Sequence, residues 1–174
     1  MNESSTLLRT ILSDAINLEK NGLSSYLKLA RRTNNITGKN MFIQLAIDEF
    51  DHQRILEKLY AELAHQNDWP VVEMPESEFE TFVPELTEKQ VKIRGASGIA
   101  ELEALTIASA FEQKAMNYYL EKASIVDNEK GKRFLLRLAD MEKAHHTIIQ
   151  AELDYITQTG FWFDIPEFRM DGKF

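Results

Sequence analysis

The chain has 174 residues, of which 44% are hydrophobic and 28% are charged, proportions that are ordinary for one globular domain. A formal net charge of −8 disfavours nucleic acid as a partner, since phosphate recognition needs clustered lysine and arginine. There is no cysteine, which excludes disulfides, cysteine-ligated zinc and iron–sulfur or rubredoxin-type centres in this chain. The first residues lack the basic start and apolar stretch of a signal peptide, and no apolar run could span a membrane. We therefore expect a cytoplasmic protein without a membrane partner.

The first predicted unit is a helical hairpin over residues 5–67. Apolar residues recur at helical spacing over residues 5–33 and again over residues 37–67, and the polar run at residues 33–35 separates the two helices. Each helix has about 30 residues and is therefore roughly 45 Å long. Because the turn is short, we expect the two helices to be antiparallel neighbours.

Residues 68–96 are predicted to connect this hairpin to the next one. Pro70, Pro75 and Pro84 rule out a continuous helix, although one short helix is predicted over residues 87–94. A connection of this length can cross the long axis of a helical bundle.

A second helical hairpin is predicted over residues 97–160. Its first helix begins at Ser97, a candidate N-cap, and the pair Asp127-Asn128 turns the chain into the last helix. Residues 161–174 form a tail rich in aromatic residues, which is too apolar to be left in water. The expected architecture is thus all-α: a single four-helix bundle of two antiparallel hairpins joined by a long crossover.

The second hairpin repeats the first at a displacement of 93 residues. Residues 12–55 and 105–148 share 14 identities without a gap, where chance would give about three. An ungapped register argues for a duplicated hairpin rather than convergence on a common helical fold. Four of the repeated pairs carry ligand chemistry: Glu19/Glu112, Tyr26/Tyr119, Glu49/Glu142 and His52/His145.

These four pairs predict a site for two metal ions. Seven residues are about two helical turns, so the Glu and Tyr of each hairpin share a face, as do the Glu and His of each Glu-x-x-His. Four buried carboxylates need cations or protons to be tolerable, and two divalent ions would neutralise them. Oxygen and imidazole ligands without thiolate suit iron or manganese better than structural zinc.

The repeat also suggests a role for each residue. Two glutamates would bridge the ions and one Glu/His pair would hold each ion: Glu49 and Glu142 as bridges, Glu19 with His52, and Glu112 with His145. Tyr26 and Tyr119 are predicted to donate hydrogen bonds to ligand carboxylates, with ordinary core packing as the alternative.

Four other polar residues are expected to lie outside the site. Asp48 and Asp51 flank His52 but have no acidic counterpart in the second hairpin, so we expect them at the surface. His65 and His146 are expected off the ligand stripe.

This pattern resembles the ferritin-like di-iron carboxylate proteins, most closely the rubrerythrin-like branch. Glu-x6-Tyr on the first and third helices, beside Glu-x-x-His on the second and fourth, is similar to the rubrerythrin arrangement over about residues 5–160. The ending Phe161-Trp162-Phe163-Asp164 with Pro166-Glu167-Phe168 also resembles tails in this group.

The resemblance implies two iron ions, with manganese or a mixed manganese/iron pair as the alternative. It implies an oxidoreductase of peroxidase or ferroxidase type that acts on peroxide or dioxygen, with a role in oxidative stress. Since the chain has no rubredoxin domain, electrons would come from a separate donor such as a rubredoxin or another reductase. We expect a homodimer or a higher homo-oligomer.

One departure from the family puts efficient peroxidase turnover in doubt. Rubrerythrins carry an extra metal-binding glutamate one turn after the ligand of the third helix, where this chain has Ala115. Two other functions therefore stay open. The protein could handle or store iron as ferritins do, or it could be a helical interaction module whose metals only stabilise the fold.

Overall fold

Four long helices make up most of the computed structural model, which describes residues 3–63, 69, 91–92, 97–159 and 161–162. Their bounds are α1 (Glu3–Arg32), α2 (Ile36–Leu63), α3 (Ser97–Ile125) and α4 (Glu129–Thr159). The predicted all-α fold is confirmed, although the last predicted turn of the second helix, residues 64–67, lies outside the described residues. None of the described helices is both long and apolar enough to cross a membrane.

The same residue type begins the second helix of each hairpin. Asn35 Oδ1 accepts hydrogen bonds from the backbone N–H groups two and three residues later, at 2.8 and 3.2 Å. Asn128 Oδ1 does the same at 3.0 and 3.1 Å. These N–H groups have no partner within the helix, so an asparagine at the N-cap satisfies them. The Asn35/Asn128 identity in the repeat thus marks the start of α2 and of α4.

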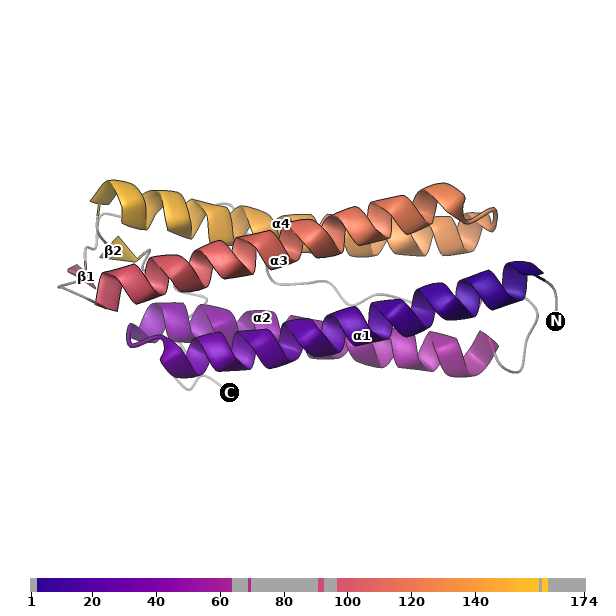
Figure 1. The fold of residues 1–174 in the computed structure, drawn as a ribbon, viewed down its shortest axis with the longest axis horizontal. Helices are drawn as coiled ribbons and strands as arrows, with labels where there is room; N and C mark the ends of the chain where they lie inside the picture. The colour runs from indigo at the N-terminus through magenta and orange to yellow at the C-terminus, as the bar shows by residue number, and fades with distance from the viewer. Residues whose placement is uncertain (1–2, 64–68, 70–90, 93–96, 160, 163–174) are drawn as a thin grey trace, which may run out of the picture.

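The helices pair as two antiparallel hairpins, α1 with α2 and α3 with α4, and the hairpins contact each other mainly through α1 and α3. Figure 1 shows one hairpin stacked over the other. Arg9 Nη2 donates to the carbonyl of Leu63 at 3.2 Å, so the end of α2 lies beside the start of α1. At the other end, the Asn35 N–H donates to Glu101 Oε1 at 3.1 Å, which places the start of α3 there. The end of α2 and the start of α3 therefore lie at opposite ends of the bundle, as the predicted crossover requires.

A two-stranded pairing lies at one end of the bundle (Figure 1). Strand β1 (Val91–Lys92) pairs antiparallel with β2 (Phe161–Trp162), with Val91 opposite Trp162. The helix predicted over residues 87–94 is therefore wrong for Val91 and Lys92, because their backbone pairs with the segment after α4 instead of within a helix. The rest of that predicted helix, and the tail after Trp162, lie outside the described residues.

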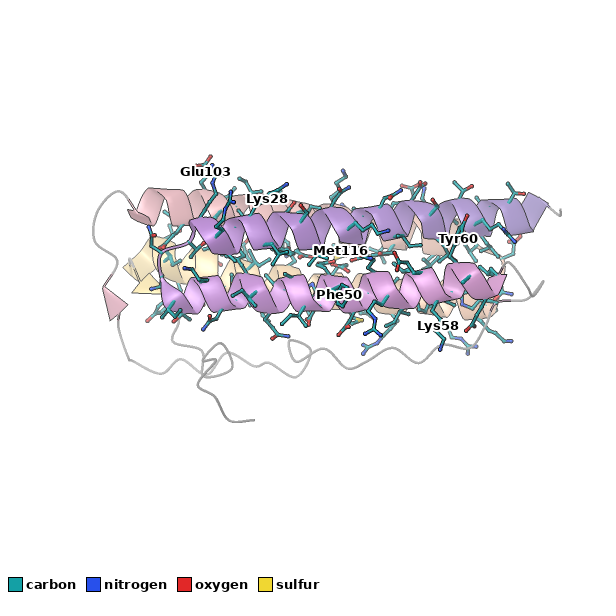
Figure 2. All side chains as sticks on the ribbon, turned by 90° about the horizontal axis from the view of Figure 1, so that it is seen from below. Lys28, Phe50, Lys58, Tyr60, Glu103 and Met116 are labelled. Carbon is teal, nitrogen blue, oxygen red and sulfur yellow. The ribbon has the colours of Figure 1, made fainter. Side chains whose placement is uncertain are left out.

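Two apolar clusters fill the bundle and leave a polar layer between them. Side chains from facing helices occupy the space between the ribbons, whereas Phe50, 45% exposed, lies on the outward side of α2 (Figure 2). The six predicted ligands are spread over the four helices. Along each helix they lie between the residues that belong to one cluster and those that belong to the other. One cluster is built on Tyr26, Leu29, Phe42, Leu45, Leu105, Ile148 and Ile149, and the other on Ile11, Leu12, Leu56, Leu59, Tyr119, Leu135 and Leu138.

Candidate metal centre

All six predicted ligands meet in this polar layer, and each side chain is at most 1% exposed. Their ligand atoms form two groups whose members lie within 4.8 Å of one another, and Glu49 and Glu142 belong to both groups. A carboxylate that belongs to both groups lies where a ligand that bridges two ions would be expected. We call the groups the His52 position and the His145 position: Glu19, Glu49, His52 and Glu142 in the first, and Glu49, Glu112, Glu142 and His145 in the second.

Both imidazoles turn the same ring nitrogen toward the carboxylates. His52 Nδ1 lies 3.3 Å from Glu142 Oε1 and 3.5 Å from Glu19 Oε2. His145 Nδ1 lies 3.6 Å from Glu142 Oε2 and 3.7 Å from Glu112 Oε2. The rings are nearly parallel, with centroids 5.7 Å apart and an interplanar angle of 17°. Each Nδ1 is therefore the nitrogen available to a cation, and each Nε2 lies on the side of the ring away from the ligand glutamates.

The two predicted tyrosines cross between the hairpins. Tyr26 on α1 donates its hydroxyl hydrogen bond to Glu112 Oε1 on α3, and Tyr119 on α3 donates to Glu19 Oε1 on α1. Burial, followed by the charge of the neighbouring carboxylates, raises the pKa of both phenols well above 10. Both hydroxyls therefore stay protonated, and each fixes one oxygen of a ligand carboxylate while the other oxygen faces the site.

Burial makes the carboxylates hard to ionise without a cation. Burial and the negative charge of Glu142 raise the pKa of Glu112 to about 8. The same two causes raise the pKa of Glu49 well above its ordinary value. Burial would also raise the pKa of Glu142, but the imidazoles of His145 and His52 outweigh it and hold that pKa below its ordinary value.

The imidazoles take up protons because carboxylates surround them. Burial alone would lower the pKa of His52, but the carboxylates of Glu142 and Glu19 raise it to about 10. His145 behaves alike, because Glu112 and Asp48 outweigh burial and raise its pKa well above 6.5. The metal-free cluster is thus held together by protons that cations would displace.

The described atoms of the cluster fit a pair of divalent cations. Both carboxylate oxygens of Glu49 and of Glu142, and Oε2 of Glu112, are buried without a hydrogen-bond partner among the described residues. Leaving a buried polar atom unsatisfied costs about 1–3 kcal/mol, and more for a charged one. Oxygen donors with two imidazole nitrogens and no sulfur are the ligands of iron or manganese. This donor set therefore fits the metals that the sequence predicts.

Asp48 belongs to this site, and the prediction that it lies at the surface is wrong. It is 8% exposed, and its Oδ2 accepts a hydrogen bond from His145 Nε2 at 3.1 Å. Gln44 Nε2 in turn donates to Asp48 Oδ1 at 3.2 Å. Helical spacing could have found it, because Asp48 lies four residues before His52 on the buried stripe of α2. The prediction was wrong because Asp48 has no acidic counterpart in the second hairpin, and both hairpins were assumed to support the site equally.

The remaining polar residues behave as predicted where the structure describes them. Asp51 is half-exposed, and its Oδ1 lies 3.8 Å from Arg54 Nη1. His146 lies outside both ligand groups, with Nε2 3.2 Å from Ser109 Oγ. His65 lies outside the described residues.

Neither residue three positions after the α1 and α3 ligands can supply a further donor. Ala115 is buried, at 1% exposure. At the equivalent Gly22, an added Cβ would lie 2.9 Å from Phe111 Cε1 and 3.1 Å from Glu49 Cδ. Gly22 therefore leaves the space that the carboxylate of Glu49 occupies, the glutamate that both ligand groups share.

The comparisons with known proteins agree with this geometry. A family model described as Rubrerythrin matches residues 10–153. A solved structure of a hypothetical protein from Pyrococcus furiosus is similar over 87% of this chain and 90% of its own, with 27% identity and a TM-score of 0.63. Among proteins of curated function, none matches the chain. Because the family match spans the ferritin-like four-helix bundle and all six predicted ligands, the chain belongs to the rubrerythrin family of di-iron proteins.

Proposed function

We propose that this protein is a non-haem di-iron oxidoreductase that reacts with peroxide or dioxygen. One observation carries the proposal: two buried ligand groups share Glu49 and Glu142, so two cations would lie side by side rather than in separate sites. When bound there, two Fe²⁺ ions could together supply the two electrons that reduce one oxygen–oxygen bond while each ion is oxidised only to Fe³⁺. A manganese or mixed manganese/iron pair is the alternative that the same donors allow.

The chain's own residues would hold and enclose such a pair. The six carboxylate and imidazole ligands balance its charge, and the phenols of Tyr26 and Tyr119 each restrain one oxygen of Glu112 and Glu19. The apolar clusters on either side exclude bulk water from the layer between them. A dry, preorganised site strengthens each electrostatic contact made during the reaction.

Two features of the chain bear on how the reaction would proceed. Ala115 offers no donor where the family resemblance places a further glutamate, so the proposed centre has six protein ligands. We expect slower peroxide turnover than a seven-ligand centre gives. We infer that the electrons for repeated turnover come from a separate reductase, such as a rubredoxin, since this sequence has no cysteine for a rubredoxin-type centre.

The test is oxidant consumption by the iron-loaded protein. Chain loaded anaerobically with two equivalents of Fe²⁺ should consume peroxide or dioxygen in stopped flow, with the oxidation of two irons per oxidant. The variant Glu142→Gln should lose this reaction because it removes a shared ligand. The matched control is Asp140→Asn, an exposed acid on the same helix, which should react like the parent.

Fully loaded protein that consumes neither oxidant would reject the proposal. If iron nevertheless raised the melting temperature of that protein, its metals would serve only to stabilise the fold.

A further inference from the structure

The two histidines of the site have different surroundings on the side that faces away from the carboxylates. His145 Nε2 lies 3.1 Å from Asp48 Oδ2, a carboxylate that Gln44 also holds. His52 Nε2 is buried and has no hydrogen-bond partner among the described residues. The residue that corresponds to Asp48 after the 93-residue displacement is Met141, which is 1% exposed and has no oxygen to accept a hydrogen bond.

The rest of the site is nearly the same in the two hairpins. The difference between the surroundings of His145 Nε2 and His52 Nε2 is therefore not compensated by another ligand. Each position has one unshared glutamate, one imidazole Nδ1 and both bridging glutamates. Each unshared glutamate also accepts one hydrogen bond from a tyrosine of the other hairpin. Gly22 and Ala115 differ between the hairpins as well, but neither carries a donor.

Asp48 prepares His145 for a metal in two ways. By accepting the hydrogen of Nε2, it fixes the tautomer in which the lone pair of Nδ1 faces Glu112 and Glu142, and it fixes the ring plane. Its carboxylate also makes the imidazole a better electron donor. His52 lacks both effects, and a metal on its Nδ1 would leave the hydrogen of Nε2 buried and unsatisfied.

We propose that the two metal positions are unequal, that the His145 position fills first and holds its metal more tightly, and that Asp48 is the positioning residue responsible. The inference rests on the two-metal site of the proposed function, but on no reaction with an oxidant. Loss of a carboxylate partner of a metal-bound histidine typically lowers affinity by about 10–100-fold, which sets the expected difference between the positions.

The first test asks where a single equivalent of metal goes. Crystals of metal-free protein supplied with one equivalent of Mn²⁺ alone should show anomalous scattering mainly at the His145 position. Equal occupancy of both positions, or preference for the His52 position, would overturn the inference. This measurement uses the parent chain, so it does not depend on whether any variant folds.

The second test asks whether Asp48 causes the difference. Two binding steps alone would not decide this, because repulsion between two neighbouring cations also separates them. We therefore compare Asp48→Met, which makes the two hairpins alike, with Asp51→Met, the same change at a half-exposed position of the same helix. Anaerobic calorimetric titration with Fe²⁺ should show the tighter step weakened about 10–100-fold in Asp48→Met and unchanged in Asp51→Met.

A matched pair of ligand variants assigns the steps. His145→Gln should lose the tighter step, whereas His52→Gln should keep it. The reverse pattern, or an unchanged tight step in Asp48→Met, would overturn the inference while leaving the proposed function standing. Parent protein that binds no Fe²⁺ would overturn both, so the two failures are distinguishable.

Discussion

Removing the metal should make the stability of this protein fall as the pH rises from 6.5 to 8. In the metal-free fold, burial and the charge of Glu142 raise the pKa of Glu112 from 4.5 to about 8. Burial lowers the pKa of His52, but Glu142 and Glu19 overcome this and raise it from 6.5 to about 10. Between pH 6.5 and 8 the unfolded chain has released protons that the folded chain still holds. A rise in pH therefore lowers the free energy of unfolding. The raised pKa of Glu49 acts in the same direction.

The size of the effect follows from the number of retained protons. Each proton that only the folded state holds changes the free energy of unfolding by about 1.4 kcal/mol per pH unit. Two such protons, on His52 and Glu112, over about 1.5 pH units give a loss on the order of 4 kcal/mol. For a chain of this size, that loss lowers the melting temperature by roughly 8–16 °C. Above pH 8, Glu112 ionises in the folded state too, so its contribution ends there, whereas the contribution of His52 continues up to about pH 10. The lowered pKa of Glu142 acts only at acid pH, outside this window.

The assay is thermal unfolding of chelator-treated protein at pH 6.5, 7.25 and 8, followed by calorimetry. The same scans on protein loaded anaerobically with Fe²⁺ are the control, because the metal replaces the protons and its affinity rises with pH. The loaded protein should therefore keep or increase its melting temperature over this range. A Glu112→Gln variant should show a shallower decline than the parent, since its amide cannot titrate.

A metal-free melting temperature that stays constant or rises from pH 6.5 to 8 would contradict the reasoning. It would mean that the folded cluster does not retain the protons of Glu112 and His52, and that the cost of burying these groups is offset in some other way.

Three substitutions test the local geometry. Gly22→Ala places a Cβ 3.1 Å from Glu49 Cδ, so this glutamate, which both ligand groups share, must shift. We expect weaker Fe²⁺ binding by calorimetry and a loss of about 1–3 kcal/mol in urea unfolding. Gly131→Ala places a Cβ 2.8 Å from Trp69 Cε3 and should destabilise the fold by a similar amount, with metal stoichiometry unchanged. Tyr119→Phe removes the hydrogen bond to a ligand carboxylate and should weaken Fe²⁺ binding by about tenfold.

Controls separate effects on the site from effects on the fold. Tyr118→Phe removes a hydrogen bond to the carbonyl of Ile11, which involves none of the ligands, so it should lower stability by about 1 kcal/mol and leave Fe²⁺ affinity unchanged. If Tyr118→Phe weakened iron binding as much as Tyr119→Phe, the phenol of Tyr119 would have no special role. An unchanged Fe²⁺ affinity in Gly22→Ala would show that Glu49 can move without loss.

The sequence by itself determined the helices and which of their residues share a face of one helix. Helical geometry is local, so Glu49 and His52 share a face wherever that helix packs, and a spacing of seven does the same for Glu19 and Tyr26. Because the same spacings recur 93 residues later, the second hairpin was predicted to place the matching residues in the same way, which gave a paired ligand set. The caps at Asn35 and Asn128 are also local, since an N-cap acts on the N–H groups two and three residues later, although only Ser97 was predicted as an N-cap.

Only the tertiary structure decided which side chains meet across the hairpins. Tyr26 donates to Glu112, 86 positions away, and Asp48 accepts from His145, 97 positions away. Such contacts depend on how far each helix is rotated about its axis and on the distance between hairpins, which packing of the whole core sets. The pairing of Val91 with Trp162 is non-local in the same way. Duplication therefore made the ligands predictable from spacing, whereas the contact between Asp48 and His145, which has no equivalent in the other half of the site, was decided by how the hairpins pack together.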